Sequence, residues 1–298
     1  MTSAVVFAYH NVGVRCLSVL LAHGVKVALV VTHQDQPDEN IWFDSVASLA
    51  RDHGIPTMTP DSAEDSALWD KLTQLTPDFI FSFYYRHMLP KAVLALARRG
   101  AYNMHGSLLP KYRGRVPVNW AVLHGERETG ATLHRMVEKP DAGAMLAQQA
   151  VPILPDDTAA QVFAKVTVAA EMALDRVLPA LLGGSAEEVP LDLAAGSYFG
   201  GRKAADGCID WRQTAAQIHN LVRAVAPPYP GAFCTLPNGG TLRLLRTLHQ
   251  PLRAPRHALP TLYRDGEVEL IDCADGLVLS LLDWEGPWQG ETLALAAP

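Results

Sequence analysis

The chain contains 298 residues, of which 49% are apolar and 19% charged, and its formal net charge is −6. This is the composition of an ordinary globular chain with enough apolar material for one large domain and a small one. The mild acidity argues against a nucleic-acid partner, because proteins that bind nucleic acids usually present a basic face.

The four cysteines, at positions 16, 208, 234 and 273, have neither the spacing of a metal site nor the density of a disulfide scaffold. The first residues lack a basic stretch followed by a long apolar run, and no run reaches transmembrane length. We therefore expect a cytoplasmic protein with no signal peptide and no membrane insertion.

The first third of the chain reads as an alternation of strands and helices. A strand at 4–8, a helix to about residue 21 and a strand at 25–32 form a βαβ opening. Its turn lacks G-x-G-x-x-G, so we expect no bound NAD. Further helices are expected at 42–52, 65–75 and 90–100, and further strands at 56–58, 79–83 and 101–104. This alternation predicts an α/β fold with a Rossmann-like, mostly parallel sheet covered by helices on both faces.

The pattern of expected elements changes at about residue 200. Before that point we expect a helix at 116–124, strands at 129–137 and 144–153, and a long helix at 158–182. A helix at 214–225 and strands at 232–236, 241–248, 267–273 and 277–284 follow, separated by Asn-Gly and Asp-Gly turns. This pattern predicts a small antiparallel, barrel-like (OB-like) domain at 201–298 after a Rossmann-like catalytic domain at 1–200.

The most informative stretch runs from Asn103 to Gly143. Asn103 and His105 stand two apart on an expected strand, so their side chains point to the same face. The strand ends in a loop rich in Gly and Pro, where parallel α/β sheets place their ligands. An amide can donate to an oxyanion and an imidazole can carry a proton. Asp141 follows in a later loop, and a carboxylate beside the imidazole is expected to raise the imidazole pKa.

The string Asn-x-His-Gly-Ser-Leu-Leu-Pro at 103–110, followed by Asp-x-Gly at 141–143, resembles the signature of formyltransferases that use 10-formyltetrahydrofolate. The stretches at 5–10, 81–87, 105–115, 132–136, 222–225 and 230–233 are similar to the formyltransferase half of ArnA-type enzymes. Those enzymes formylate UDP-4-amino-4-deoxy-L-arabinose on the lipid A modification route. The resemblance implies that Asn103, His105 and Asp141 are the catalytic set.

The same resemblance implies small-molecule partners, a folate and a nucleotide sugar. It implies 10-formyltetrahydrofolate as the formyl donor, with no metal and no NAD. The folate-binding residues that it implies are His87, Met88, Leu89, Arg115, Val137, Glu138, Lys139, Pro140 and Asp141. It leaves the oligomeric state and the sugar-binding residues open. Arg202 and Arg223 are weaker candidates for contact with the nucleotide sugar.

Other functions remain open at this point. A methionyl-tRNA formyltransferase is disfavoured by Arg115, where those enzymes usually carry a small apolar residue, and by nine Lys/Arg against ten Asp/Glu in residues 201–298. A formyltetrahydrofolate deformylase would share the motif but use water as the acceptor. A Ser-His-Asp hydrolase would use Ser107, which stands outside a G-x-S-x-G elbow. A folate or nucleotide sensor with an inert site is the non-enzymatic alternative.

Some polar residues of the region have more than one interpretation. Lys111, Arg113 and Arg115 suit the recognition of phosphate or carboxylate, although a solvated basic loop gives the same pattern. His124 and His134 lie ten residues apart without H-x-x-x-H or C-x-x-C spacing, so we expect a structural or surface role for both.

Overall fold

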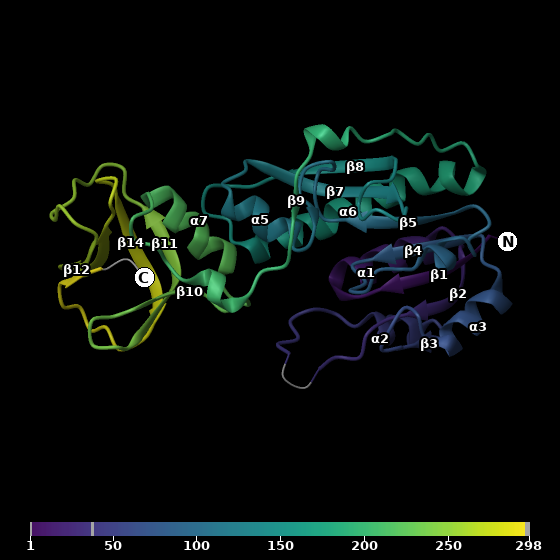
Figure 1. Ribbon diagram of the computed structural model, residues 1–298, viewed down its shortest axis with the longest axis horizontal. Helices are drawn as coiled ribbons and strands as arrows, with labels where there is room; N and C mark the ends of the chain where they lie inside the picture. The colour runs from purple at the N-terminus through teal and green to yellow at the C-terminus, as the bar shows by residue number, and fades with distance from the viewer. Residues whose placement is uncertain (1, 37–38, 296–298) are drawn as a thin grey trace. The chain divides into compact units, whose positions relative to one another are not determined.

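The computed structural model describes residues 2–36 and 39–295 and divides into two compact units (Figure 1). Unit 1 comprises Met1–Pro117, Thr129–Val151 and Ala164–Phe199. Unit 2 comprises Val118–Glu128, Pro152–Phe163 and Gly200–Pro298. The predicted division of the chain into independent domains at residue 200 remains a proposal. In the described part of the chain, no helix is long and apolar enough to cross a membrane.

Unit 1 is built on a seven-stranded sheet with the order β3-β2-β1-β4-β5-β7-β8. The strands are β1 Ser3–Ala8, β2 Lys26–Val31, β3 Thr57–Met58, β4 Phe79–Phe83, β5 Gly100–His105, β7 Glu128–Arg135 and β8 Met145–Pro152. β1 pairs in parallel with both β2 and β4, and β4 with β5, whereas β7 runs antiparallel to β5. The predicted mostly parallel α/β sheet is therefore confirmed.

In the sheet, strands β2 and β3 lie on one side of β1, and β4 and the later strands lie on the other. This strand order places the topological switch point between β1 and β4, where open α/β sheets bind ligands beyond the carboxyl ends of their strands. The helices of this part are α1 His10–Ala22, α2 Val46–Asp52, α3 Ser66–Leu75, α4 Lys91–Leu94 and α6 Ala159–Gly183. The strands are largely apolar, as expected for a sheet buried on both faces, and all five residues of β4 are buried.

Unit 2 contains a six-stranded antiparallel sheet packed on helix α7, Ala215–Val225. The strand order is β10 Ala232–Thr235, β11 Thr241–His249, β14 Val278–Glu285, β13 Val268–Asp272, β12 Thr261–Asp265 and β15 Leu293–Ala294. Thr214 and Gln217 form a capping box at the start of α7, and Ile218 and Val222 of this helix lie in one apolar core with Trp211. The predicted antiparallel, barrel-like sheet is confirmed as a half-barrel.

Several expected elements differ in the structure. The helix expected from residue 42 begins at Val46, because the Ser45 side chain caps it by accepting the Ser48 N–H at 3.2 Å. The helix expected from 90 to 100 is only the short α4. Helix α5 is Pro117–Leu123. The strands β6 Arg113–Gly114 and β9 Tyr198–Phe199, which pair in parallel, and the strands β12 and β15 were not expected.

Candidate active site

Two neighbouring strands of unit 1 carry the polar side chains of the site. Asn103 and His105 lie on β5, with His105 as its last residue. In the antiparallel ladder between β5 and β7, Asn103 is directly opposite His134, and His105 is opposite Thr132. Asp141 lies in the loop between β7 and β8. Directly opposed residues of a ladder place their side chains on one face, so this register brings His134 to Asn103.

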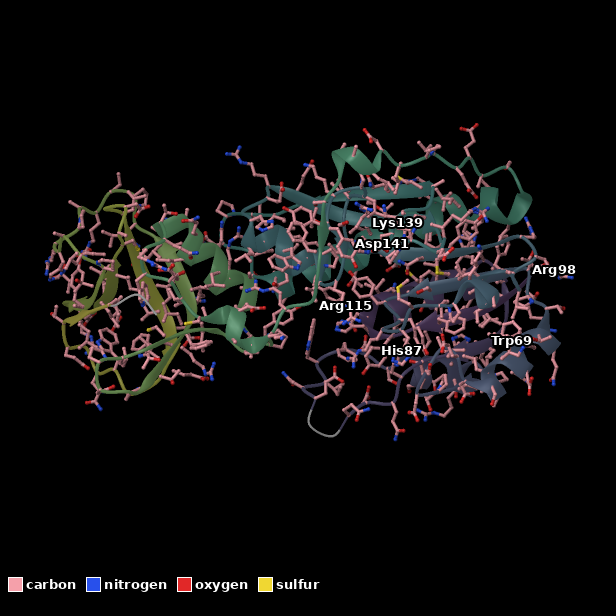
Figure 2. All side chains as sticks on the ribbon, viewed as in Figure 1. Trp69, His87, Arg98, Arg115, Lys139 and Asp141 are labelled. Carbon is pink, nitrogen blue, oxygen red and sulfur yellow. The ribbon has the colours of Figure 1, made fainter. Side chains whose placement is uncertain are left out.

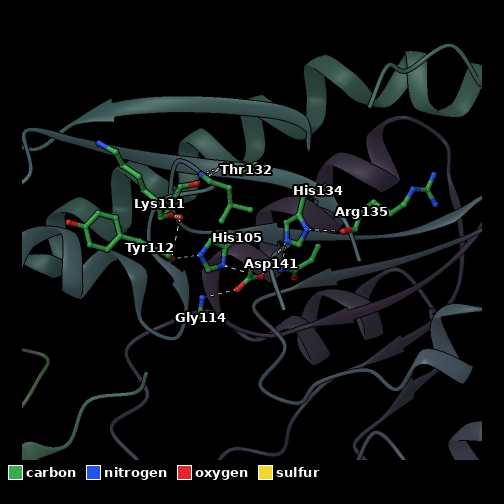
Figure 3. A network of polar contacts seen from close by, with 11 residues as sticks. His105, Lys111, Tyr112, Gly114, Thr132, His134, Arg135 and Asp141 are labelled. Carbon is green, nitrogen blue, oxygen red and sulfur yellow. Dashed lines mark hydrogen bonds and ion pairs between the residues drawn. The ribbon is translucent and has the colours of Figure 1, made fainter. Parts of the chain in front are cut away.

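Asp141 lies between the two imidazoles (Figure 3). Its Oδ1 is 3.5 Å from His105 Nδ1 and 3.4 Å from His134 Nε2. Asn103 Nδ2 is 3.2 Å from His134 Nε2. The His105 and Asp141 side chains are 7% and 12% exposed, so the set is mostly withdrawn from water yet still reachable. The structure thus brings together the three predicted catalytic residues and adds His134, for which a structural or surface role was expected.

Main-chain atoms of the loop after β5 hold the imidazole and the carboxylate. The ring N–H at His105 Nε2 donates to the Tyr112 carbonyl oxygen at 2.8 Å. The Gly114 N–H donates to Asp141 Oδ2 at 2.9 Å. Because a carbonyl only accepts, Nε2 carries the proton of the neutral His105 ring and the lone pair is on Nδ1. His105 can therefore accept a proton at the nitrogen that faces Asp141.

His134 has its tautomer set in the same way. Its Nδ1 lies 2.9 Å from the Arg135 carbonyl oxygen and must donate to it. In the neutral ring, Nε2 then accepts an N–H from Asn103. The second N–H of the Asn103 amide makes no hydrogen bond to any described residue. The cross-strand register that creates this contact is a tertiary property, and the only signal for it in the sequence is the Thr-x-His pattern at 132–134 beside the Asn-x-His pattern.

Burial decides the charge of His105. It lowers the pKa of this imidazole below its ordinary value, although Asp141 and the bond to Tyr112 oppose the shift. Asp141 thus acts in the expected direction, but the net shift of the His105 pKa is downward, because desolvation of the imidazolium outweighs the attraction of one carboxylate. Burial also disfavours ionised Asp141, but His105, His134 and the Gly114 N–H together hold the Asp141 pKa below its usual range. The resting state has a neutral imidazole and an ionised carboxylate.

Ser107 serves the loop and not the imidazole. Its hydroxyl is fully buried and donates to the Lys111 carbonyl oxygen at 2.7 Å. The hydroxyl of Thr132 donates to the Ser107 carbonyl oxygen at 2.6 Å and accepts the Leu109 N–H at 3.2 Å. No hydrogen bond joins Ser107 to His105 in the part of the chain that the structure describes. This arrangement argues against the Ser-His-Asp hydrolase.

The backbone of the active-site loops is strained. Of the six described non-glycine residues with positive φ, five follow strands of unit 1: His10, Tyr84, Tyr112, Val116 and Asp141. Gly114 has φ +96°, and a Cβ there would lie 2.1 Å from the Phe199 carbonyl oxygen. Such conformations cost free energy and tend to gather at functional sites.

The residues implied for folate binding occupy different environments. Met88 is 63% exposed, whereas Leu89 lies in the apolar core of unit 1. His87 Nδ1 is buried without a hydrogen-bond partner within residues 2–36 and 39–295, as is the Tyr85 hydroxyl near it. Val137, Glu138, Lys139 and Arg115 are exposed, and Pro140 is half-buried. Figure 2 shows His87, Arg115, Lys139 and Asp141 on unit 1. Their folate-binding role stays a proposal.

A cavity of about 430 Å³ opens at the carboxyl ends of β1 and β2. It is lined by Tyr9, Thr32, His33, Gln34, Asp35, Ile41, Phe43, Asp44, Ser45, Val46, Ala47 and Thr59. Tyr9 donates to Asp35 at 2.5 Å, and the Arg86 guanidinium lies over the Tyr9 ring. The cavity includes none of the four residues of the polar network, so it is a separate hollow at the same edge of the sheet.

Among residues 2–36 and 39–295, no group of three or more His, Cys, Asp or Glu side chains is arranged to hold a metal ion. The guanidinium of Arg202 donates to Asn119 and to the Asp206 carbonyl, and that of Arg223 to Asn220 and to two main-chain carbonyls. These bonds within unit 2 give Arg223 a structural role and argue against its contact with the nucleotide sugar. The Arg202 Nε is buried without a partner among the described residues, so a contact of Arg202 with the nucleotide sugar stays a proposal.

Solved structures with a similar fold include sugar N-formyltransferases. The N-formyltransferase of Helicobacter canadensis, solved with folinic acid and dTDP-3-aminofucose, has a TM-score of 0.72 and 19% identity, over 94% of this chain and 99% of its own. WlaRD, a sugar 3N-formyl transferase solved with dTDP and 5-N-formyl-THF, has the same TM-score and identity, over 94% and 97%. HypX from Aquifex aeolicus, solved with tetrahydrofolic acid, has a TM-score of 0.63 and 19% identity over 98% of this chain and 45% of its own.

At these identities the structural likeness concerns the fold. The family comparison goes further, because it covers most of the chain. Residues 15–178 match the family described as formyl transferase, and residues 202–286 match the formyl transferase C-terminal domain. The chain belongs to the formyl transferase family.

Proposed function

We propose that this protein transfers a formyl group from 10-formyltetrahydrofolate to the amine of a nucleotide-linked amino sugar. The observation that carries the proposal is the network of Asn103, His105, His134 and Asp141, which holds an available amide N–H beside a neutral imidazole. These two groups are what acyl transfer to an amine requires: one stabilises negative charge on the carbonyl oxygen and the other moves a proton.

Each residue of the network has a separate task. The amide N–H of Asn103 that His134 leaves unused would donate to the oxyanion. His105 would take the proton of the attacking amine at Nδ1 and later release it to the departing nitrogen. Asp141 would stabilise the imidazolium while it exists, since its Oδ1 already faces Nδ1 at 3.5 Å. Gly114 and Tyr112 would keep both groups in place through main-chain hydrogen bonds.

The folate proposal is supported by polar atoms at the end of β4. The Tyr85 hydroxyl and His87 Nδ1 are buried and lack partners among the described residues, which is costly unless a ligand supplies them. The folate, when bound, would supply the formyl group. The N-formyltransferase of Helicobacter canadensis and WlaRD are both solved with a formylated folate and with a dTDP-sugar or dTDP, which supports this pairing of substrates.

For the acceptor we propose UDP-4-amino-4-deoxy-L-arabinose, the substrate of the ArnA-type formyltransferases. The support is the sequence likeness at 81–87, 105–115 and 132–136. The pathway that follows from this acceptor is lipid A modification, which confers polymyxin resistance. The same chemistry on a dTDP-linked amino sugar is the nearest competing proposal, because relatives of similar fold are solved with such ligands.

A mass-spectrometric transfer assay tests both levels of the proposal. The protein is incubated with 10-formyltetrahydrofolate and one acceptor at a time: UDP-4-amino-4-deoxy-L-arabinose, a dTDP-linked amino sugar or methionyl-tRNA. We expect the arabinose derivative to gain the mass of one CO, with none gained by an Asn103→Ala, His105→Ala double variant. A gain on the dTDP-sugar alone would overturn the acceptor but keep the chemistry. Formyl transfer to methionyl-tRNA alone, or formate release without an acceptor, would overturn the function.

A further inference from the structure

Arg113 is a buried arginine whose guanidinium has no hydrogen-bond or ion-pair partner among the described residues. Its side chain is 9% exposed, and its Nε is fully enclosed and has no hydrogen-bond partner. No hydrogen bond, ion pair or ring contact joins its guanidinium to any residue within 2–36 and 39–295. Arginine stays charged at every physiological pH, so most of this guanidinium has been withdrawn from water without a partner from the described part of the chain.

The other withdrawn arginines behave differently. Arg223, which is 6% exposed, donates to three oxygen atoms. Arg202, whose Nε is also buried without a partner among the described residues, still donates to Asn119 Oδ1 and to the Asp206 carbonyl oxygen. A buried charged group normally has such partners because desolvation without them is expensive. Arg113 is therefore an exception, and a missing anion would explain it.

The position of Arg113 relates it to the catalytic set. It is the first residue of β6 and directly precedes Gly114, whose N–H holds Asp141. Its own N–H donates to the Ser197 carbonyl oxygen, which ties this segment to the chain before β9. Lys111 and Arg115, two residues away on either side, are exposed and have no carboxylate partner among the described residues. Three cations within five residues thus make a locally positive segment in a chain of net charge −6.

We infer that Arg113 binds a phosphate of the diphosphate that joins the nucleoside to the amino sugar. The inference rests on the proposed function and deepens it. A guanidinium forms two parallel hydrogen bonds with phosphate, which suits a site that must fix the acceptor in one orientation. In a nucleotide sugar only the pyranose ring separates the amine from the diphosphate. The terminal carboxylates of folate, the other available anions, lie beyond the benzoyl ring from the reacting nitrogen.

The variant Arg113→Gln distinguishes between two roles of Arg113, ligand binding and structural support. Removal of an uncompensated buried charge should raise the melting temperature of the ligand-free protein, whereas loss of a structural arginine should lower it. UDP and dTDP serve as probes in calorimetric titrations, with folinic acid as the carboxylate probe. We expect Arg113→Gln to weaken binding of the better nucleotide roughly 10- to 100-fold and to leave folinic acid binding unchanged. Arg113→Lys, which keeps the charge, should lose less.

The matched control is Arg98→Gln. Arg98 is 60% exposed, pairs with Asp78 and lies at the far end of unit 1 from Arg115 (Figure 2). This variant should bind both probes as the parent does and should show no rise in melting temperature.

Three results would overturn the inference. In the first, Arg113→Gln lowers the melting temperature and binds the nucleotides normally, which would make Arg113 structural. In the second, the variant loses folinic acid and keeps the nucleotides, which would assign the guanidinium to the folate carboxylates. In the third, the parent formylates a sugar acceptor but Arg113→Gln has an unchanged acceptor KM. Absence of formyl transfer with Arg113-dependent UDP binding would instead overturn only the proposed reaction.

Discussion

The amide of Asn103 depends on an imidazole that does not itself reach the substrate in our proposal. The Nδ1–H of His134 donates a hydrogen bond to the Arg135 carbonyl oxygen, so the lone pair of the neutral ring is on Nε2. This lone pair accepts from the Asn103 amide, so the amide nitrogen and not the amide oxygen faces the ring. One N–H is bound there, and the other has no hydrogen-bond partner in the described part of the chain. If His134 became protonated, Nε2 would donate to Asp141 and Asn103 would lose its acceptor. His134 is thus a positioning residue that acts through its contact with the Asn103 amide.

His134→Phe should lower kcat about fivefold with little change in either KM. It keeps a ring of similar size but removes the acceptor, and one such hydrogen bond is worth about 1 kcal/mol. His134→Gln offers a side-chain oxygen to the same N–H and should recover part of the rate. Steady-state kinetics on both variants test this. If phenylalanine and glutamine behave alike, the role of His134 is packing only.

His105→Ala or Asp141→Ala should reduce kcat by orders of magnitude, because the first removes the proton acceptor and the second removes the charge that stabilises imidazolium. Circular dichroism should show a retained fold. Since burial lowers the pKa of His105, the acid limb of the parent pH–rate profile should lie below the ordinary histidine range. Near-normal turnover in either variant would contradict the mechanism.

Main-chain groups of the loops hold the catalytic side chains in place, and several residues of these loops have a strained backbone conformation. The segments that follow β1, β4, β5, β6 and β7 each contain a non-glycine residue with positive φ. Each such residue costs on the order of 1–3 kcal/mol, which the surrounding packing must offset. The rigid parallel strands between them provide that packing, since β1 and β4 are almost entirely buried.

In unit 2, helix α7 is joined to two distant segments by one side chain. Arg223 donates to the carbonyl oxygens of Val122 and Asp157, both at 3.1 Å, and burial lowers its pKa. These bonds fix residues 118–128 and 152–163 to the half-barrel unit. The arginine therefore has a structural role, consistent with its low exposure of 6%.

Arg223→Met should destabilise unit 2 by about 2–4 kcal/mol, because it leaves buried carbonyl oxygens without donors. Urea unfolding followed by tryptophan fluorescence would report on it, since Trp211 lies in the core of this unit. Arg212→Gln, which breaks only a surface ion pair with Asp210, is the control and should leave the midpoint unchanged. An unchanged midpoint for Arg223→Met would refute this role.

At the scale of the whole molecule, buried histidines determine how the fold responds to acid. Burial lowers the pKa of His10 and of His33 to about 4, and it also lowers the pKa of His105 and His219. The unfolded chain binds a proton at each of these positions near the ordinary pKa of about 6.5. Below that pH the unfolded state binds more protons than the folded state, so the free energy of unfolding falls as the pH falls.

The melting temperature should therefore be constant above about pH 7 and decline steadily between about pH 6.5 and 4. Thermal unfolding across a pH series measures this profile. His33→Gln should make the decline shallower, because it removes one of the protons taken up on unfolding. A flat profile down to pH 4, or a profile that His33→Gln leaves unchanged, would show that these rings titrate in the folded state as in the unfolded one.

Local patterns predict this protein well wherever the deciding contact is local. The two-residue spacing of Asn103 and His105 on a strand, and the long apolar periods of the helices, are properties of a few neighbouring residues. The contact of His134 with Asn103 depends on the β5–β7 register, and the lowered pKa of His105 depends on burial from many directions. Strand β6 escaped prediction because it contains a glycine at φ +96° and shows no alternation.

The main-chain attachment of the catalytic pair also has a consequence for engineering. Tyr112 and Gly114 hold His105 and Asp141 through a carbonyl and an amide, so the neighbouring side chains at 111, 113 and 115 are free of that duty. A randomised library restricted to positions 111 and 113, with the proposed folate-binding Arg115 kept, would explore acceptor preference while the proton-transfer residues stay constant. In this loop the side chains are available for recognition of the acceptor, and the main-chain groups hold the catalytic pair. The loop is therefore a suitable starting point for the design of enzymes that formylate other amines.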